Sequence, residues 1–467
     1  MNVQIGNRIR VEDPSKEIVD WAKKNLVFPN PQYEQKKRMG LWTGTTPKHL
    51  QMYEWDGNTI VLPFGVCREI MPMVRGCLTT TAFKQDTVID YGGRDMELYD
   101  YQEEAVARMM DAKYGILKAT TGSGKTQMGI AMIKRFRRRA LWLCHTADLL
   151  KQSRDRALRY IPEEIIGTIT EGKVNVGIGV TFATVQTMAV LDLTMYRDYW
   201  DVVIVDECQM VGSSATTFTR YEKVLNHLAA RHKIGLSATP ERSDGLTGAM
   251  FALLGKVAYE VPESAVADRV MGARIRPVMT DTRITDDCLN DDGTINYVKL
   301  ITHLVEDKKR NRLIADTIIE NRGHSCLVLS DRLEQLVEII LMLPDEMKED
   351  ACFINGKMTS KEDKALREQY IEQMRTGEKK YLFASFSLAK AGLDIPRLDR
   401  LFLASPAKFS ATITQSVGRV RRTFPGKEIP VVFDFVDEQI GYCLRAYKER
   451  CRSYRKMGTE IEKGFLK

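Results

Sequence analysis

A glycine-rich segment that ends in lysine and threonine is a candidate phosphate-binding loop. Residues 119–126 read Ala-Thr-Thr-Gly-Ser-Gly-Lys-Thr, after an apolar run that predicts a strand and before an apolar-periodic stretch that predicts a helix. Glycines let successive backbone N–H groups turn toward phosphate oxygens, and the helix N-terminus adds its positive dipole end. We therefore expect Lys125 to reach the β- and γ-phosphates of ATP and Thr126 to ligate Mg²⁺. The other loop residues expected to bind the nucleotide are Thr121, Gly122, Ser123 and Gly124. A chance loop rich in glycine and serine is the alternative, which the strand-to-helix setting disfavours.

Two adjacent carboxylates follow the apolar run 202–205, which predicts a buried strand. A nucleotide hydrolase needs two carboxylates of different function at such a place. Asp206 would hold Mg²⁺ through water, and Glu207 would orient and deprotonate the attacking water. An Asp-Glu pair at a strand end is common by chance. Its position after a phosphate loop, in an alternating pattern of strands and helices, favours the catalytic interpretation.

Arginines in the segment 415–422, which reads Gln-Ser-Val-Gly-Arg-Val-Arg-Arg, suit the negative charge of a transferring phosphoryl group. Arg419 and Arg422 are three residues apart, so on a helical turn they would project on one side. Both could then reach the γ-phosphate as arginine fingers from the same chain, beside Gln415. A solvated basic helix is the alternative for any one of these arginines.

Two series of short apolar strands alternate with amphipathic helices, which predicts two parallel sheets with helices on both faces. The first series lies within residues 96–262 and the second within 268–436. The expected strands are 116–119, 140–144, 176–181, 202–205 and 233–236 in the first series, and 325–329, 352–354, 381–384, 400–403 and 429–433 in the second. The second series has no phosphate loop, so we expect it to contribute residues to the ATP that the first series binds.

Residues 1–91 predict a small α+β module. A strand within 3–11 should precede a helix that begins at Asp13-Pro14, and a β-hairpin with its turn at 56–58 should precede a second helix within 66–77.

Between these elements, Lys36, Lys37 and Arg38 lie near the aromatic residues Tyr33 and Trp42. Such a mixture is common on surfaces that bind nucleic acid. A solvated basic loop is an equal alternative, and the module as a whole could be a stabilising appendage of the first lobe.

The C-terminal residues 437–467 predict one basic amphipathic helix. Its apolar stripe, which should dock back on the protein, consists of Ile440, Leu444, Tyr447, Cys451 and Tyr454. A solvated face is expected for its basic residues, which are Arg445, Lys448, Arg450, Arg452, Arg455 and Lys456.

The composition is that of a globular protein without a membrane span. Apolar residues make up 44% of the chain and charged residues 28%, and no apolar run approaches the roughly 18 residues that cross a bilayer. The N-terminus shows no secretory signal, and the nine cysteines form no C-x-x-C pair. We therefore expect a cytoplasmic protein without zinc sites or disulfides. The net charge of +7 suits a polyanionic partner but does not require one.

The order of these motifs resembles that of the superfamily 2 helicases and translocases. Residues 119–126 resemble motif I, 206–209 motif II, 237–239 motif III, 391–396 motif V and 415–422 motif VI. The resemblance implies two tandem RecA-like lobes. It implies adenine recognition by Tyr99 and Gln102, further nucleotide contacts by Gly392 and Asp394, and coupling through Gln209, Ser237, Ala238 and Thr239. Two departures stand out: Tyr99 occupies a position where arginine is common, and Gln209 one where histidine is frequent.

The same resemblance places nucleic-acid contacts at strand ends in both lobes, where hydroxyls and backbone amides would grip phosphates. The positions implied are Thr146, Thr184, Gln186 and Thr187 in the first lobe, and Ser330, Ser385 and Phe386 in the second.

Two further segments narrow the resemblance. Residues 236–245 resemble the branch that contains XPB-like, restriction-translocase and phage helicases, and residues 40–44 with 62–66 resemble the N-terminal domain of phage branch-migration helicases of the UvsW type. The resemblance implies an ATP-dependent DNA helicase or translocase that acts on branched or forked DNA in replication, recombination or repair, and a phage as its source. An RNA helicase, or an ATP-gated clamp that binds nucleic acid without unwinding it, is the alternative.

Overall fold

The computed structural model describes residues 1–38, 40–84, 88–211, 215–241, 245–356, 358, 360–386, 388, 393, 395–406 and 410–462. The backbone divides into two compact units. The first consists of Met1–Thr120 and Gly124–Pro262, and the second of Thr121–Ser123 and Glu263–Lys467. Each unit contains one large parallel sheet, so the prediction of two parallel-sheet lobes is confirmed.

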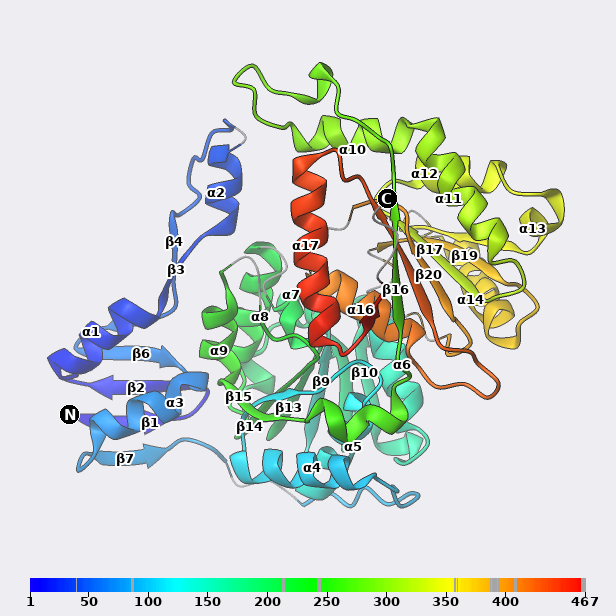
Figure 1. Cartoon of the computed structure of the whole chain (residues 1–467). Coiled ribbons are helices and arrows are strands. Elements are labelled where there is room, and N and C mark those ends of the chain that lie inside the picture. Colours follow the sequence, from blue (N-terminus) through cyan, green and yellow to red (C-terminus); the bar gives the residue numbers. More distant parts are fainter. Residues whose placement is uncertain are drawn as a thin grey trace. The chain divides into compact units, whose positions relative to one another are not determined.

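The first unit opens with a five-stranded sheet in the order β5-β6-β2-β1-β7 (Figure 1). Its strands are β1 (Asn2–Ile5), β2 (Arg8–Glu12), β5 (Glu54–Asp56), β6 (Thr59–Pro63) and β7 (Leu78–Thr81). The strand expected within residues 3–11 is in fact the hairpin of β1 and β2, because the chain turns at Gly6, whose N–H donates to Arg8 O at 3.0 Å. The predicted hairpin around Gly57 is present as β5 and β6.

The helices of this module differ from the prediction at their ends. Helix α1 (Lys16–Asn25) begins after Ser15, whose Oγ accepts the Ile18 N–H. The predicted start at Asp13 is wrong because Asp13 has a φ of +45°, whereas an N-cap residue needs an extended backbone. The second helix is shortened to α3 (Cys67–Ile70), which a 3₁₀ turn that contains Pro72 follows.

The module and the first parallel sheet share one hydrophobic core. Gly65 lies against helix α9 (Thr247–Leu254) so closely that a Cβ there would be 2.5 Å from Phe251 O. The ammonium of Lys233, fully buried, donates to Leu225 O at 2.6 Å and to Asn7 O at 3.2 Å. The module is therefore anchored by close backbone packing and by hydrogen bonds of the buried Lys233 side chain.

Residues 27–51 extend from the module as an arm (Figure 1). The short strands β3 (Val27–Pro29) and β4 (His49–Gln51) pair in antiparallel fashion at its base, and helix α2 (Pro31–Arg38) lies beyond them.

The parallel sheet of the first unit has the strand order β11-β10-β12-β9-β13-β14-β8-β15, and only β10 and β11 are antiparallel. Its strands are β8 (Gly115–Lys118), β9 (Ala140–Cys144), β10 (Ile166–Thr170), β11 (Lys173–Asn175), β12 (Val180–Thr184), β13 (Val202–Asp206), β14 (His232–Ser237) and β15 (Val257–Glu260). The helices are α4 (Asp100–Ala112), α5 (Lys125–Phe136), α6 (Ala147–Ala157), α7 (Val185–Val190), α8 (Ala215–His227) and α9. Strand β12 starts later than the predicted residue 176, because Gly177 and Gly179 carry no side chains to pack in a sheet.

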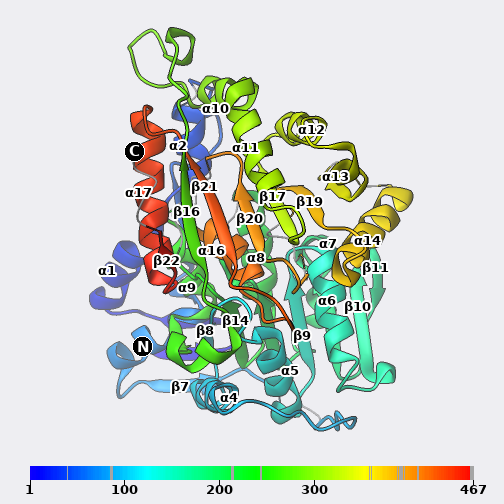
Figure 2. The same cartoon turned by 45° about the vertical axis from the view of Figure 1, so that its right-hand side comes forward.

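The sheet of the second unit has the order β18-β19-β17-β20-β21-β16-β22, and Figure 2 shows β16, β21, β20 and β17 side by side. The strands are β16 (Arg274–Met279), β17 (Cys326–Ser330), β18 (Ala351–Ile354), β19 (Tyr381–Ser385), β20 (Arg400–Leu403), β21 (Val431–Val436) and β22 (Glu460–Ile461). The helices are α10 (Tyr297–Glu306), α11 (Lys308–Glu320), α12 (Leu333–Leu341), α13 (Asp345–Glu349), α14 (Lys361–Thr376), α16 (Ser410–Val420) and α17 (Gly441–Lys456). Strands β16 and β22 were not expected, and β21 begins after Pro430, which cannot donate to the ladder.

Helix α17 docks on β21 through charge as well as apolar contact. Arg450, expected on a solvated face, is buried and donates to both carboxylate oxygens of Asp434, at 2.8 and 2.7 Å. The Tyr454 hydroxyl donates to the same carboxylate at 2.7 Å. Sequence periodicity could not reveal this pair, because the partner carboxylate belongs to a strand outside the helix.

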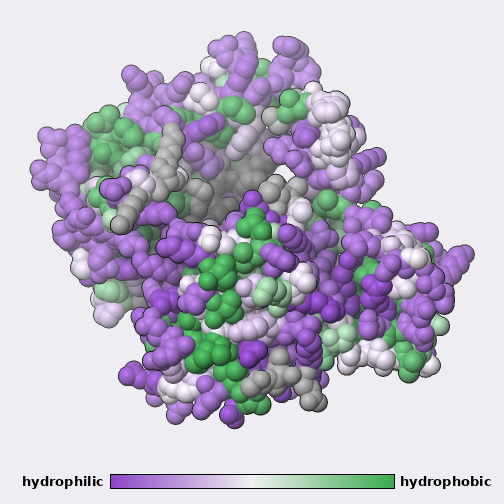
Figure 3. Space-filling model, turned by 180° about the vertical axis from the view of Figure 1, so that it is seen from behind, coloured by the Kyte–Doolittle hydropathy of each residue, from purple (hydrophilic) through white to green (hydrophobic). Residues whose placement is uncertain are grey.

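No helix among the described residues is both long and apolar enough to cross a membrane. On the face drawn in Figure 3, hydrophobic residues form patches between hydrophilic ones. Most large apolar side chains lie instead in the cores around the sheets.

Candidate nucleotide site and nucleic-acid interface

The glycine-rich loop leads from β8 into α5, as predicted. Gly122 and Gly124 have φ values of +93° and +84°, in the left-handed region that favours glycine. Lys125 is the first residue of α5 and is mostly buried, and its Nζ donates to Ala119 O at 3.3 Å. The loop therefore closes around its own lysine at a helix N-terminus, where backbone N–H groups and the helix dipole attract phosphate.

Gln102 lies beside this loop, at the start of α4. Its Oε1 accepts the Tyr99 N–H at 3.1 Å, and its Nε2 is so close to Gly124 that a Cβ on that glycine would lie 2.4 Å away. The Tyr99 side chain is 47% exposed and stacks on Tyr101. The structure thus brings Gln102 to the phosphate loop, while its Oε1 already caps the N-terminus of α4.

Asp206 and Glu207 occupy the carboxyl end of β13, next to β9 and β14 in the sheet. Asp206 is buried and accepts hydrogen bonds from Ser153 Oγ at 3.1 Å and from Glu207 N at 3.0 Å. Burial, and then the negative charge of Glu207, raise the pKa of Asp206 to about 6, against the opposing charge of Lys125. The positive charge of Lys125 therefore acts on this carboxylate.

Glu207 has a φ of +48°, which is strained for a residue with a side chain. Such strain persists only where the surroundings impose it, and it concentrates at functional sites. Ser153, on α6, was missed by sequence reasoning, because no local pattern marks a helical serine as the partner of a distant strand end.

A chain of hydrogen bonds connects Glu207 to the end of β14. Gln209 Nε2 donates to Glu207 Oε2 at 2.6 Å, and Gln209 Oε1 accepts from Ser237 Oγ at 2.6 Å. Ser237 Oγ in turn accepts the Thr239 N–H at 3.0 Å, and Ala238 lies between the two. The four residues assigned to coupling are thus brought together. Glutamine can make both bonds of the bridge, because its amide has a donor and an acceptor side.

In the second unit, Gln415 and Arg419 lie one helical turn apart on α16 and are both buried. Arg419 Nη1 donates to Leu393 O at 2.8 Å. Arg422 lies beyond the helix and pairs its backbone with Val270, so the prediction that Arg419 and Arg422 share a helical turn is wrong. The helix ends at Val420, and Gln415 rather than Arg422 shares the face of Arg419. Gly392 and Asp394 lie outside the described residues.

The contacts expected in the first lobe gather at the carboxyl ends of the neighbouring strands β9 and β12. Thr146 caps α6, where its Oγ1 accepts the Leu149 N–H at 3.3 Å. Gln186 Nε2 donates to His145 O at 2.8 Å, which ties the two strand ends together. Thr184 and Thr187 are buried and bond to each other through their hydroxyls at 3.0 Å.

In the second unit, Ser330 and Ser385 end β17 and β19 and are register partners. Ser330 Oγ is buried and donates to Gln335 Oε1 at 2.7 Å. Phe386 is buried in the core of this sheet. The expected contacts at Ser330 and Phe386 could therefore involve the backbone, whereas the aromatic ring is not presented for stacking.

The basic residues of the arm are differently exposed. Lys37 is exposed, whereas Lys36 is half-buried and donates from Nζ to Thr46 Oγ1 at 2.8 Å. Arg38 is the last residue of α2. Trp42 is 85% exposed, more than any other large apolar side chain among the described residues.

Two family models match this chain. One, described as the res subunit of type III restriction enzymes, matches residues 95–242, and the other, the helicase conserved C-terminal domain, matches residues 308–423. The first match spans β8 to β14 of the first parallel sheet, and the second spans β17 to β20 and helix α16 of the second.

Individual proteins are similar over most of the chain. A putative ATP-dependent RNA helicase of Acanthamoeba polyphaga mimivirus is 25% identical over 369 residues, which cover 78% of this chain and 68% of that protein. The DNA 3'-5' helicase XPB of Kineococcus radiotolerans is 27% identical over 327 residues, which cover 66% of this chain and 54% of that protein. The solved structure of the DNA-bound ATP-dependent type ISP restriction-modification enzyme LlaBIII has a TM-score of 0.57 at 14% identity, over 84% of this chain and 32% of that one. The structural likeness shows the same fold.

Proposed function

Because this chain belongs to the superfamily 2 helicases and is therefore an ATP-hydrolysing enzyme, we propose that it is a DNA helicase or translocase that acts on branched or forked DNA. We place this activity in replication, recombination or repair. The observation that carries the motor part of the proposal is the chain of hydrogen bonds from Glu207 through Gln209 to Ser237, which joins the predicted catalytic base to a second strand end. Such a bridge gives ATP hydrolysis a route to the rest of the lobe. The choice of DNA is supported by the similarity to a DNA 3'-5' helicase.

In this proposal the first lobe binds and hydrolyses ATP. The N–H groups of residues 121–124 bind phosphate oxygens, and Lys125 exchanges its bond to Ala119 O for the β- and γ-phosphates. Glu207, held by Gln209, orients the attacking water and takes its proton. Gln102 and Tyr99 border the adenine.

Magnesium fits the donors that the site offers. Thr126 and Asp206 supply two hard oxygen ligands. This suits a cation that keeps water and phosphate as its other ligands. When bound, Mg²⁺ would neutralise charge on the phosphates.

From the second lobe, Arg419 supplies positive charge to the transferring phosphoryl group, and Gln415 on the same helical face assists it. Arg422 is a weaker candidate for this role, since it lies beyond the helix. Gly392 and Asp394 would complete the nucleotide contacts.

The grip on DNA is proposed at the strand ends, where Thr146, Gln186 and Thr187 in the first lobe and Ser385 in the second offer hydroxyls and backbone amides to phosphates. We assign residues 1–91 to substrate choice, 96–262 and 268–436 to the two lobes, and 437–467 to a helix that docks on the second lobe.

An RNA helicase is the second candidate, favoured by the mimivirus relative's name. A clamp that binds without unwinding is the third.

ATPase stimulation and strand separation test the proposal together. The protein is assayed with forked DNA, a four-way junction, plain duplex, single-stranded DNA and RNA duplex, with Lys125→Ala as the inactive control. We expect the strongest unwinding on forks and junctions. Unwinding of RNA alone would establish the second candidate. DNA-stimulated hydrolysis with neither unwinding of a substrate nor movement along DNA would establish the clamp.

A further inference from the structure

The described residues of the arm, 27–38 and 40–51, are fixed by contacts at its base. Asn30 is buried at its base, where its Nδ2 donates to Pro47 O at 2.8 Å and its N–H to Lys48 O at 3.0 Å. Phe28 packs on Gly248 of α9, where a Cβ would lie 2.6 Å from the phenyl ring. The arm is therefore fixed to the first lobe at one end and held together across its own base.

Trp42 follows helix α2 within the arm. Its indole lies directly on Gly44, since a Cβ there would be 2.6 Å from the ring atom Cζ3. Gly44 also has a φ of +49°, so two independent features require glycine at this position. One face of the ring is thus supported by the backbone, while the side chain as a whole remains 85% exposed.

The charge around Trp42 favours a polyanion. Residues 31–51 contain Lys36, Lys37, Arg38 and Lys48 but a single carboxylate, Glu34. Lys37 and Lys48 are exposed.

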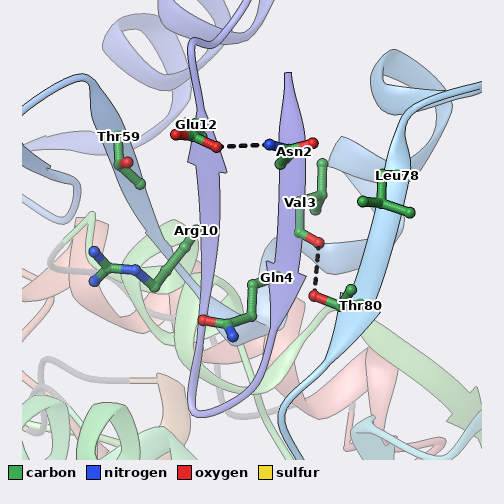
Figure 4. Close-up of a pocket in the computed structure, with 8 residues that line it drawn as sticks. All are labelled: Asn2, Val3, Gln4, Arg10, Glu12, Thr59, Leu78 and Thr80. Atoms are coloured by element: carbon green, nitrogen blue, oxygen red, sulfur yellow. Dashed lines mark hydrogen bonds between the residues drawn. The ribbon is translucent and has the colours of Figure 1, made fainter.

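The open face of the five-stranded sheet in the same module offers no comparable surface. The hollow in Figure 4, lined by Arg10, Glu12 and Thr80 among others, has a carboxylate for each nearby cation. Arg10 is paired with Asp56 at 2.5 Å and Arg8 with Glu54 at 2.8 Å. An anionic partner would have to displace these carboxylates, so the arm is the part of the module that suits DNA.

We infer that the arm reads DNA branch points, with the indole of Trp42 stacked on the base pair exposed where the strands diverge. This inference rests on the proposed function. A branch point differs from plain duplex in having an unstacked base pair, which offers a flat apolar face, and an indole with one supported face is complementary to it. Stacking is indifferent to sequence because every base has a π-face. Lys37 and Lys48 would bind the phosphates on either side, which supplies affinity without identifying the branch.

The test uses the full-length protein and a synthetic fork with 2-aminopurine in the base pair at the branch point. Its emission changes when the base stacks on an aromatic ring. The variants are Trp42→Ala, Trp42→Phe, which keeps a smaller ring, and Trp55→Ala. Trp55 is the matched control because it is a 48% exposed tryptophan of the same module, on β5 between Glu54 and Asp56.

Trp42→Ala should weaken fork binding by roughly 5- to 150-fold, the range for loss of one stacked base, and remove most of the 2-aminopurine change. Trp42→Phe should retain part of both signals, and Trp55→Ala should match the wild type. Stimulation of ATPase by single-stranded DNA should stay within about twofold of the wild type in Trp55→Ala, because Trp55 lies on β5, outside the arm. Thermal unfolding should be unchanged, since the side chain is exposed.

The inference is overturned if Trp42→Ala binds and unwinds forks like the wild type, if Trp55→Ala loses as much, or if the fluorescence change occurs only with an RNA fork. A wild-type protein that neither unwinds DNA nor moves along it would instead refute the proposed function. The two failures are distinguishable, because the first leaves wild-type unwinding intact.

Discussion

Gln209 Nε2 lies 2.6 Å from Glu207 Oε2, so the residue that ends the Asp-Glu-Cys-Gln motif holds the predicted catalytic base in place. Oε1 of the same amide accepts a hydrogen bond from Ser237 Oγ. A histidine ring could also bridge two partners, but its charge depends on its protonation state. The glutamine amide makes both bonds and stays neutral.

Removing this bridge should uncouple hydrolysis from movement. We expect Gln209→Ala and Ser237→Ala each to lower unwinding by about tenfold, the effect of roughly 1.4 kcal/mol, while ATP affinity changes little. Because the residues share one network, the double variant should be little worse than either single one. Additive losses in unwinding would show that the two bonds act independently.

Lys125→Ala should abolish ATP hydrolysis but leave DNA binding largely intact, because Lys125 lies in the phosphate loop. Glu207→Gln should bind ATP and stall, since a carboxamide keeps the shape but cannot accept the proton. Nucleotide binding and turnover are measured separately. If Glu207→Gln fails to bind ATP, Glu207 has a structural role instead.

The position of Arg422 beyond α16 makes the two arginines unequal. Arg419→Ala should lower turnover by as much as roughly 10³-fold with little effect on ATP affinity, as expected for a group engaged in the transition state. Arg422→Ala should lower turnover by a smaller factor. Single-turnover hydrolysis is measured for both variants. Equal losses of turnover would show that the two arginines have equal roles.

Lys233 predicts a rise of stability with pH. Burial lowers its pKa from 10.5 to about 7. Between these pH values the unfolded chain binds more protons than the folded one, so the free energy of unfolding should increase as pH rises. Lys233→Met removes the titrating group and should flatten this dependence. Denaturant unfolding at pH 7 and pH 10 gives the comparison, and an unchanged slope in the variant would assign the effect elsewhere.

The pair of Arg450 and Asp434 should stabilise the second lobe. Arg450→Ala leaves the Asp434 carboxylate buried without its guanidinium, which typically costs about 3 to 5 kcal/mol. Arg452, exposed on the same helix, is the matched control, and its alanine variant should stay within about 0.5 kcal/mol of the wild type. Calorimetry of both variants measures the difference; equal stabilities would mean that α17 docks by apolar contact alone.

The module and the first sheet share one hydrophobic core, so substrate choice is tested better by substitutions in the arm than by deletion of the module. Deletion of residues 1–91 would uncover Phe251 and leave the ammonium of Lys233 without Asn7 O. Substitutions in the arm avoid this, because Trp42 and Lys37 lie outside that core. The two readings of the module therefore apply to different parts of it: the sheet stabilises the first lobe, and the arm is the candidate for binding.

The amino-acid sequence by itself determined the phosphate loop, the strand that ends in Asp206 and the alternation of two parallel sheets. These are local properties: glycines permit a tight turn, apolar periodicity selects strand or helix, and a polar residue after a buried strand lies at the sheet edge. Arg422 has no such local signature. It lies after the last turn of α16, so the prediction that the helix continues to this residue was wrong.

Only the tertiary structure decided which distant groups meet. The bond from Ser153 to Asp206, the bridge from Gln209 to Ser237 and the burial of Arg450 against Asp434 each join separate elements. The same holds for Phe386, a residue expected at the nucleic-acid surface that the fold buries. Sequence periodicity reports which face of an element is apolar, but the partner that covers that face is chosen by packing of the whole lobe, because burial must satisfy every charge and hydrogen bond at once.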